Sequence, residues 1–230
     1  MVVRSNLRSA AMTEKPTSDR ILDAAERLFA EHGGEDGVSM RELAAAADVK
    51  LSLLSYHFGG KAGLYRAVFA RRANQLAEAR SDALAQAIRR PEFGIRDLAE
   101  AFVRPSVAMR YSGNQQGAAF ALLTAFEAID PREARRGILA EHYDPTAQRF
   151  IAALSQLYPG APRQSIADAY LFMVGALVMT LASGSRFARL GAHDSSKQPS
   201  PDTESLTLHL IDFCTGGVDR VLSAHKPTAG

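Results

Sequence analysis

The sequence contains a single cysteine, Cys214, among 230 residues. A lone cysteine excludes an intramolecular disulfide framework and any zinc or iron–sulfur site that needs several cysteines. The sequence also lacks a phosphate-binding glycine loop and a nucleophile elbow. No two histidines are spaced to share a helix face as metal ligands; they are His32, His57, His142, His193, His209 and His225. We therefore expect no enzyme activity, no metal and no cofactor.

Long apolar runs are also missing. The longest nearly uncharged stretch, residues 166–185, still contains Asp168, Tyr170 and two glycines. It suits a buried or interface helix better than a membrane span of about 20 residues. The first twelve residues include two arginines but lack the apolar core of about 7–15 residues that a secretory signal requires. We therefore expect a cytoplasmic protein that does not contact a membrane.

Apolar residues recur at helical spacing along almost the whole chain, and no segment alternates as a strand does. With 47% hydrophobic residues, the chain can bury a sizeable core. The pattern predicts an all-α fold after a disordered tail over residues 1–15. Beyond residue 60, helices are expected at residues 61–88, 95–109 with a break near Pro105, 115–129, 131–157 with a break at Pro145, 163–190 and 203–224. Residues 191–201 are polar and are expected to form a mobile linker.

The N-terminal part predicts a packing helix followed by a second, short helix. The first helix should begin after Pro16 with Thr17 or Ser18 as its cap, and should stop at glycines 33–34. The second should begin at Ser39, because its hydroxyl can accept a backbone amide while Glu42 reaches back to the amide of Ser39.

A turn at residues 48–49 and a third short helix, residues 51–58, complete a helix-turn-helix, the arrangement that places one helix in the DNA major groove. Leu54 and Phe58 can face the core, so the outward side chains are Lys50, Ser52, Ser55, Tyr56 and His57. Ser39 and Arg41 can hold the adjacent DNA backbone, and Lys61 offers an anion site at the next helix start. Two alternatives stay open: Tyr56 can instead pack under the first helix, and His57 can be a half-buried histidine with no DNA contact.

The distribution of charge supports a nucleic-acid partner better than the net charge of +2 does. No Asp or Glu lies between Val49 and Ala77, whereas five residues there are basic: Lys50, Lys61, Arg66, Arg71 and Arg72. A solvated basic face without a partner is the alternative.

Three segments carry a family resemblance: residues 39–44 (SMRELA), 47–49 (ADV) and 54–64 (LSYHFGGKAGL). Together they resemble the DNA-binding domain of the TetR family, over about residues 17–65. The resemblance implies a homodimer on a palindromic double-stranded DNA operator. It also implies a DNA-binding domain at residues 16–62 and a larger effector-binding and dimerisation domain at residues 63–230, joined by a helix that transmits movement. Repression of transcription is implied in the same way.

Residue by residue, the resemblance places Lys50, Leu51, Ser52 and Leu53 near bases, and Ser55, Tyr56, His57 and Lys61 on the phosphate backbone. Three residues depart from the usual pattern: Asp48 replaces the common turn glycine, Lys50 a small polar residue, and Ser55 a frequent tyrosine. Aspartate tolerates a left-handed backbone better than most residues, so we expect the turn to survive. The missing tyrosine puts one phosphate contact in doubt.

The C-terminal part is similar to a TetR subgroup that includes fatty-acid-responsive regulators, through residues 103–106, 143–145, 148–150 and 172–177. This similarity implies a small hydrophobic effector. The leading hypothesis is a fatty acid or acyl-CoA with a medium or long acyl chain. Candidate lining residues are Phe102, Met109, Phe120, Phe126, Phe150 and Met173, and candidate polar anchors are Asn114, Gln115, Arg149 and Tyr170. Each of the apolar residues has simple core packing as its alternative. A DNA-binding regulator or architectural protein controlled by a protein partner, with no effector, is the alternative function.

The last two predicted helices are candidates for the dimer interface. The helix at residues 163–190 carries small residues that permit close helix approach: Gly175, Ala176, Ala182 and Gly184. An apolar stripe follows the final helix: Leu206, Leu210, Phe213 and Val221. The alternative is that both stripes belong to the core of one chain.

Overall fold

The computed structural model describes residues 16–111, 113, 115–183, 190 and 202–224. Every regular element in these residues is a helix, which confirms the all-α fold. The predicted tail, residues 1–15, and the predicted linker, residues 191–201, lie outside the described residues. The helices are α1 Thr17–Glu31, η1 Glu35–Gly37, α2 Met40–Ala46, α3 Leu51–Phe58, α4 Lys61–Ile88, α5 Ile95–Tyr111, α6 Gln115–Ile129, α7 Glu133–Arg136, α8 Ile138–His142, α9 Asp144–Leu157, α10 Arg163–Ala182 and α12 Thr203–Ser223.

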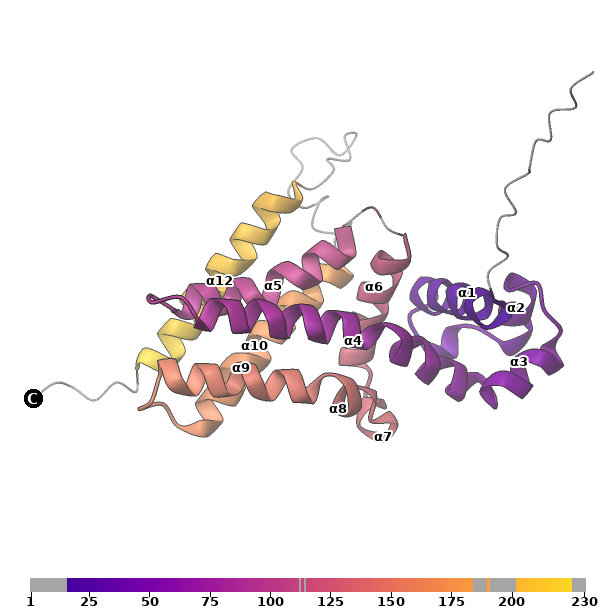
Figure 1. Ribbon diagram of the computed structural model, residues 1–230, viewed down its shortest axis with the longest axis horizontal. Coiled ribbons are helices and arrows are strands. Elements are labelled where there is room, and N and C mark those ends of the chain that lie inside the picture. Colours follow the sequence, from indigo (N-terminus) through magenta and orange to yellow (C-terminus); the bar gives the residue numbers. More distant parts are fainter. Residues whose placement is uncertain (1–15, 112, 114, 184–189, 191–201, 225–230) are drawn as a thin grey trace, which may run out of the picture.

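The molecule is elongated, with α1 to α3 at one end and α5 to α12 at the other (Figure 1). We call the first group the head and the second the body. The long helix α4 begins in the head and runs along the body, and its bounds agree with the predicted helix at residues 61–88. Because α4 belongs to both parts, a change in its position can move the head relative to the body.

The head folds around the apolar faces of its helices, where Ile21, Phe29 and Leu54 are fully buried. The predicted capping box at the start of α2 is confirmed: the amide of Glu42 donates to Ser39 Oγ at 3.2 Å, and the amide of Ser39 donates to Glu42 Oε2 at 2.7 Å. The predicted cap of α1 is wrong. Pro16 occupies the N-cap position and no side chain caps the helix, so Thr17 is already its first residue.

The cores of the head and the body meet along α4. Leu64 and Phe69 of α4 pack in the core of the head, while Leu84 packs in the core of the body. Phe120 and Leu123 of α6 also belong to the core of the head, and α1 packs directly on α6. The head is therefore seated on the body by shared side chains.

Three helix boundaries of the body differ from the prediction. The helix α5 passes through Pro105 without a break, because packing against α4, α6 and α12 offsets the backbone hydrogen bond that a proline removes. Residues 131–157 form three helices, since Gly137 adopts a left-handed φ of 67° between α7 and α8. The helix α10 ends at Ala182, before the expected end at residue 190.

Candidate nucleic-acid interface and ligand cavity

The structure exposes almost all the side chains that were predicted to contact DNA. Ser39 and Arg41 lie at the start of α2, Lys50 precedes α3, and six residues of α3 itself are exposed: Leu51, Ser52, Leu53, Ser55, Tyr56 and His57. We call these nine residues the recognition surface. The side chain of Tyr56 is 85% exposed, so the alternative that it packs under α1 is wrong, and His57 is exposed rather than half-buried.

Lys61 lies at the first position of α4 and is half-buried. Its Nζ atom donates to the backbone oxygen of Val38 at 3.3 Å, which leaves N–H groups of the ammonium for an anion. The chain can reach this position only because residue 63 is glycine: a Cβ atom there would lie 1.9 Å from the backbone oxygen of Phe58.

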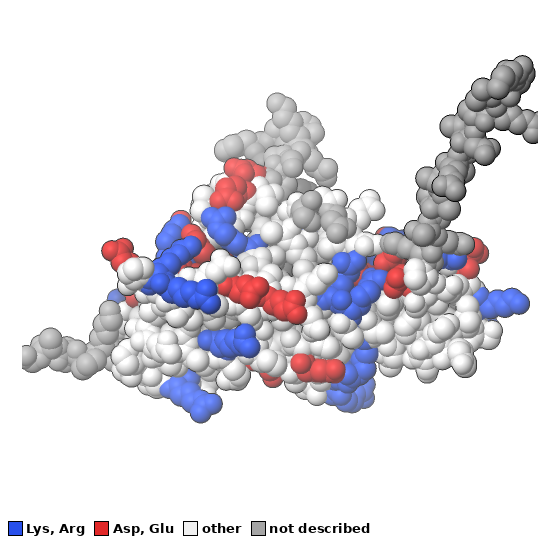
Figure 2. Space-filling model, in the orientation of Figure 1, with Lys and Arg blue, Asp and Glu red and all other residues white. Residues whose placement is uncertain are grey.

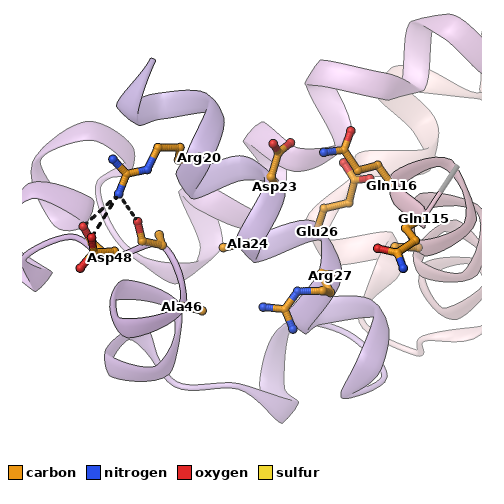
Figure 3. A pocket seen from close by; sticks show the side chains of 11 residues that line it. Arg20, Asp23, Ala24, Glu26, Arg27, Ala46, Asp48, Gln115 and Gln116 are labelled. Atoms are coloured by element: carbon orange, nitrogen blue, oxygen red, sulfur yellow. Dashed lines mark hydrogen bonds and ion pairs between the residues drawn. The ribbon is translucent and has the colours of Figure 1, made fainter. Parts of the chain in front are cut away.

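The turn between α2 and α3 holds the recognition surface in place. Asp48 has a φ of 53°, and it is the only non-glycine residue with positive φ among the described residues, so the expected left-handed turn is confirmed. Arg20 of α1 reaches across and donates to the backbone oxygens of Ala47 and Asp48 at 2.9 and 3.2 Å (Figure 3). The turn is thus fixed to the packing helix, which restricts the orientation of α3.

Several arginines of the basic segment between Val49 and Ala77 form ion pairs within the protein and are therefore not free to contact DNA. Arg71 and Arg72 both donate to Oε2 of Glu26, at 2.5 and 2.6 Å, and Glu26 is only 1% exposed. Arg71 also pairs with Asp23 at 2.8 Å. We call these four residues the α1–α4 charge cluster. Figure 2 shows positive and negative side chains intermixed where the head meets the body. The interpretation of the whole segment as a DNA-facing basic surface is therefore wrong for these arginines.

Arg66 is also paired, with Glu141 of α8 at 2.9 Å. A further buried contact links α4 to α6 and α7: the hydroxyl of Tyr65 donates to Glu127 at 2.9 Å, and Arg136 donates to both oxygens of Glu127 at 2.9 and 2.6 Å. Glu127 is fully buried. Sequence reasoning could not find these pairs, because the partners are 9 to 75 residues apart along the chain.

The body contains an apolar cavity of about 220 Å³ lined by α4, α5, α6, α8, α9 and α10. Two of the predicted effector residues line it, Phe102 and Tyr170. The others do not: Phe150 packs in the core of the body, Phe120 in that of the head, Met173 lines a different groove, and Arg149 is exposed. Met109, Gln115 and Phe126 are also absent from the lining, and Asn114 lies outside the described residues.

Apart from Tyr170, sequence reasoning missed the polar groups of this cavity, which are Arg80, Ser106, Thr124, Tyr143 and Asp144. Burial lowers the pKa of Arg80 and raises the pKa of Tyr143 to about 12. Burial also raises the pKa of Tyr170. The hydroxyl of Tyr143 already hydrogen-bonds to Thr124 Oγ1 at 3.2 Å. The phenol of Tyr170 keeps its proton at neutral pH and can donate a hydrogen bond into the cavity.

A larger cavity of about 440 Å³ lies at the junction of the head with α6. It is lined by charged and amide side chains, among them Arg20, Glu26 and Gln116 (Figure 3). Ligand pockets are mostly apolar with a few polar groups, so the smaller cavity in the body fits a hydrophobic effector better than this one does.

One side of α10 and α12 exposes large apolar side chains. Phe172 is 61% exposed and Phe213 is 69% exposed. A groove between the two helices is lined almost entirely by apolar atoms, including Phe172, Phe213 and the side chain of Cys214. By length and composition α10 is also apolar enough to cross a membrane; a helix that packs in the core of a soluble protein passes the same test.

Comparisons with known proteins agree with these features. The family described as "Tetracyclin repressor-like, C-terminal domain" matches residues 100–217, just over half of the chain, and the family "Bacterial regulatory proteins, tetR family" matches residues 21–68. The HTH-type transcriptional repressor AcnR of Corynebacterium glutamicum is 40% identical over 76 residues, which are 32% of this chain and 40% of that protein. AcnR of Corynebacterium efficiens is 38% identical over the same shares. The chain thus matches well under half of the length of these relatives.

Solved structures share the fold. The fatty acid degradation regulator FadR from Bacillus halodurans has a TM-score of 0.59 at 15% identity, covering 89% of this chain and 97% of that one. The TetR family transcriptional regulator PfmR from Thermus thermophilus has a TM-score of 0.53 at 20% identity, covering 88% and 97%. At these identities the likeness concerns the fold alone. Taken with the two family matches, which span the helix-turn-helix and most of the body, it leads to one conclusion: the chain belongs to the TetR family of bacterial transcriptional regulators.

Proposed function

We propose that the protein is a dimeric transcriptional repressor that binds a palindromic DNA operator and is released by a small hydrophobic effector. The observation that carries the proposal is the recognition surface: a short helix whose side chains are nearly all exposed, held by a turn that is fixed to the packing helix. Small hydroxyls such as Ser52 allow α3 to approach base edges, and Lys50, Leu51 and Leu53 lie beside it. In this proposal the protein acts in the cytoplasm by binding DNA, without catalysing a reaction.

Phosphate contacts would come from the edges of the same surface. Ser39 and Arg41 at the start of α2, and Ser55, Tyr56 and His57 on α3, can donate to backbone oxygens. Lys61 joins them through its free N–H groups and the amides at the start of α4.

Dimerisation would use the exposed apolar side of α10 and α12. A second copy fits this surface because Gly175, Gly216 and Gly217 have open space beside them, so a partner helix can approach closely. A bilayer fits it less well, since α12 also exposes Asp212 and Arg220, and charges are costly in lipid. A two-fold pair would place two copies of α3 about 34–36 Å apart, on successive major grooves.

The oligomeric state tests this surface. We expect a dimer in sedimentation velocity at micromolar concentration, and a monomer for Phe213→Glu. Ile129→Glu is a matched control, because Ile129 is 64% exposed on α6, away from that surface; it should stay dimeric. A monomeric wild-type protein, or one that partitions onto lipid vesicles through this surface, would refute the proposed interface.

Release would follow from filling the apolar cavity of the body. The ligand must favour a position of α4 in which the two α3 helices of the dimer no longer match successive major grooves. A ligand with equal affinity for the DNA-binding and the released conformations would not shift the equilibrium between them. The cavity of about 220 Å³ is below the usual 300–1,000 Å³ of ligand pockets. A compact ligand, or an acyl chain of short to medium length, therefore fits it better than a long chain.

The decisive experiment is binding of the protein to the DNA that flanks its own gene, measured by fluorescence anisotropy over a range of salt concentrations. Lys61→Ala should weaken binding to all sequences alike and lower the salt slope by about one unit per subunit. Changes at Ser52 should instead alter sequence preference. If Lys61→Ala altered only sequence preference, or if no flanking palindrome were bound, the proposal would fail.

A further inference from the structure

Arg80 is half-buried and has no carboxylate partner among the described residues. Arg80 projects from α4 into the apolar cavity. Its Nε and one terminal nitrogen donate to Ser106 Oγ at 3.2 and 2.7 Å, and its Cζ atom lies 4.4 Å from the centre of the Phe102 ring. Among the described residues, no acidic side chain comes within ion-pair distance of its guanidinium.

This arrangement leaves most of the hydrogen-bonding capacity of Arg80 unused. A guanidinium carries five N–H groups, and the described residues accept from two of its nitrogens, both through the same hydroxyl oxygen. The charge nevertheless remains, because an arginine stays protonated even when burial lowers its pKa. A half-buried charge with so little compensation is stabilised when an anion pairs with it.

The neighbours of Arg80 would complete an anion site. The charge of Arg80 acts on Tyr143 and Tyr170, and it lowers the pKa of both phenols against the effect of burial. All three groups line the same cavity, and the ring of Phe102 that Arg80 covers lies 5.6 Å from the ring of Tyr170 between centres. Asp144 also lines the cavity, but it is exposed, so solvent screens its charge.

We propose that the effector is a small apolar carboxylate, and that Arg80 binds its carboxylate group while the apolar part fills the cavity. The bidentate geometry of a guanidinium matches a carboxylate, and the remaining wall of the cavity is aliphatic, with residues such as Leu76, Val174 and Leu177. This inference rests on the proposed function, and it names the chemistry of the ligand. It also explains the coupling, because Arg80 belongs to α4, the helix that enters the head.

The test compares acids with neutral analogues of the same shape. Straight-chain carboxylates from hexanoate to decanoate and the matching primary amides are titrated by calorimetry into the wild type and into Arg80→Met. We expect the wild type to bind the acid at least about tenfold more tightly than its amide, because a charged hydrogen-bonded pair is lost in the amide. Arg80→Met should abolish this preference and keep the affinity for the amide. Arg149→Met, a change at an exposed arginine outside the cavity, should change neither.

A second measurement needs no ligand. If Arg80 serves a ligand, unliganded Arg80→Met should melt at the same temperature as the wild type or higher, because a half-buried charge without a carboxylate partner has been removed. A fall of several degrees would show that Arg80 is structural and would overturn the inference. Equal affinity for acid and amide, or a preference that persists in Arg80→Met, would overturn it too while leaving the apolar cavity intact. Failure of the wild type to bind either series would refute the effector cavity itself, and the inference with it.

Discussion

Two regions in which the described residues bury charge, the α1–α4 charge cluster and the body cavity, treat that charge differently. In the cluster, Asp23 and Glu26 face Arg71 and Arg72, so two acids balance two bases. In the cavity, the described residues offer Arg80 the hydroxyl of Ser106 and the ring of Phe102, and no carboxylate at ion-pair distance. The charges of the first arrangement balance within the protein and tie α1 to α4. The second gains most from an added anion, which makes it a candidate ligand site.

The largest effect should come from breaking the balanced region. Glu26→Ala would leave two partly buried arginines without their shared carboxylate, and we expect a loss of about 3 kcal/mol in the free energy of unfolding. Urea unfolding at a fixed protein concentration would measure it as a lower midpoint at constant slope. A loss below about 1 kcal/mol would mean that the cluster is not what fixes the head to the body.

A smaller effect is expected in the cavity. Ser106→Ala removes the acceptor that Arg80 uses twice, and a hydrogen bond to a charged group contributes about 1.5–3 kcal/mol. The lost stability should return when a cavity-binding carboxylate is added, since a ligand that binds only the folded form stabilises it. Thermal unfolding with and without octanoate measures both the loss of stability and its recovery. If octanoate did not restore the stability, the cavity would resemble the charge cluster in needing no added anion.

The smallest effect should come from a solvent-exposed pair. Arg27 and Glu31 lie one turn apart on α1 at 3.3 Å, and each side chain is about half exposed. Arg27→Ala should change the free energy of unfolding by only about 0.3–0.5 kcal/mol, within the same urea assay. If Arg27→Ala lowered the free energy of unfolding as much as Glu26→Ala does, burial would not determine how much an ion pair contributes to stability.

The local parts of the structure could be predicted from the sequence. The capping box at Ser39 and Glu42, the left-handed turn at Asp48 and the long helix α4 depend on residues that are neighbours in the chain. The recognition surface follows from them, because α3 has eight residues of which Leu54 is buried and Phe58 half-buried against the core of the head, so the other six are exposed.

The parts that depend on distant partners could not be predicted. Arg71 and Arg72 belong to a segment without acidic residues, and their partners come from α1, about 45 residues earlier. Arginine was expected in the effector site at position 149, but the cavity contains Arg80 instead. Which face of α4 lines the cavity depends on how α5, α6 and α10 pack around it, and helical periodicity alone does not contain that information.

The central claim, that α3 binds DNA, is tested most directly by Tyr56→Ala. Because this side chain is 85% exposed, its removal should leave the melting temperature unchanged. Fluorescence anisotropy with the operator fragment at fixed salt, with Glu31→Ala as the control, should show a loss in affinity of about tenfold per subunit for Tyr56→Ala, the size of one hydrogen bond to a charged phosphate. Unchanged operator affinity in a folded Tyr56→Ala protein would contradict the assignment of this surface.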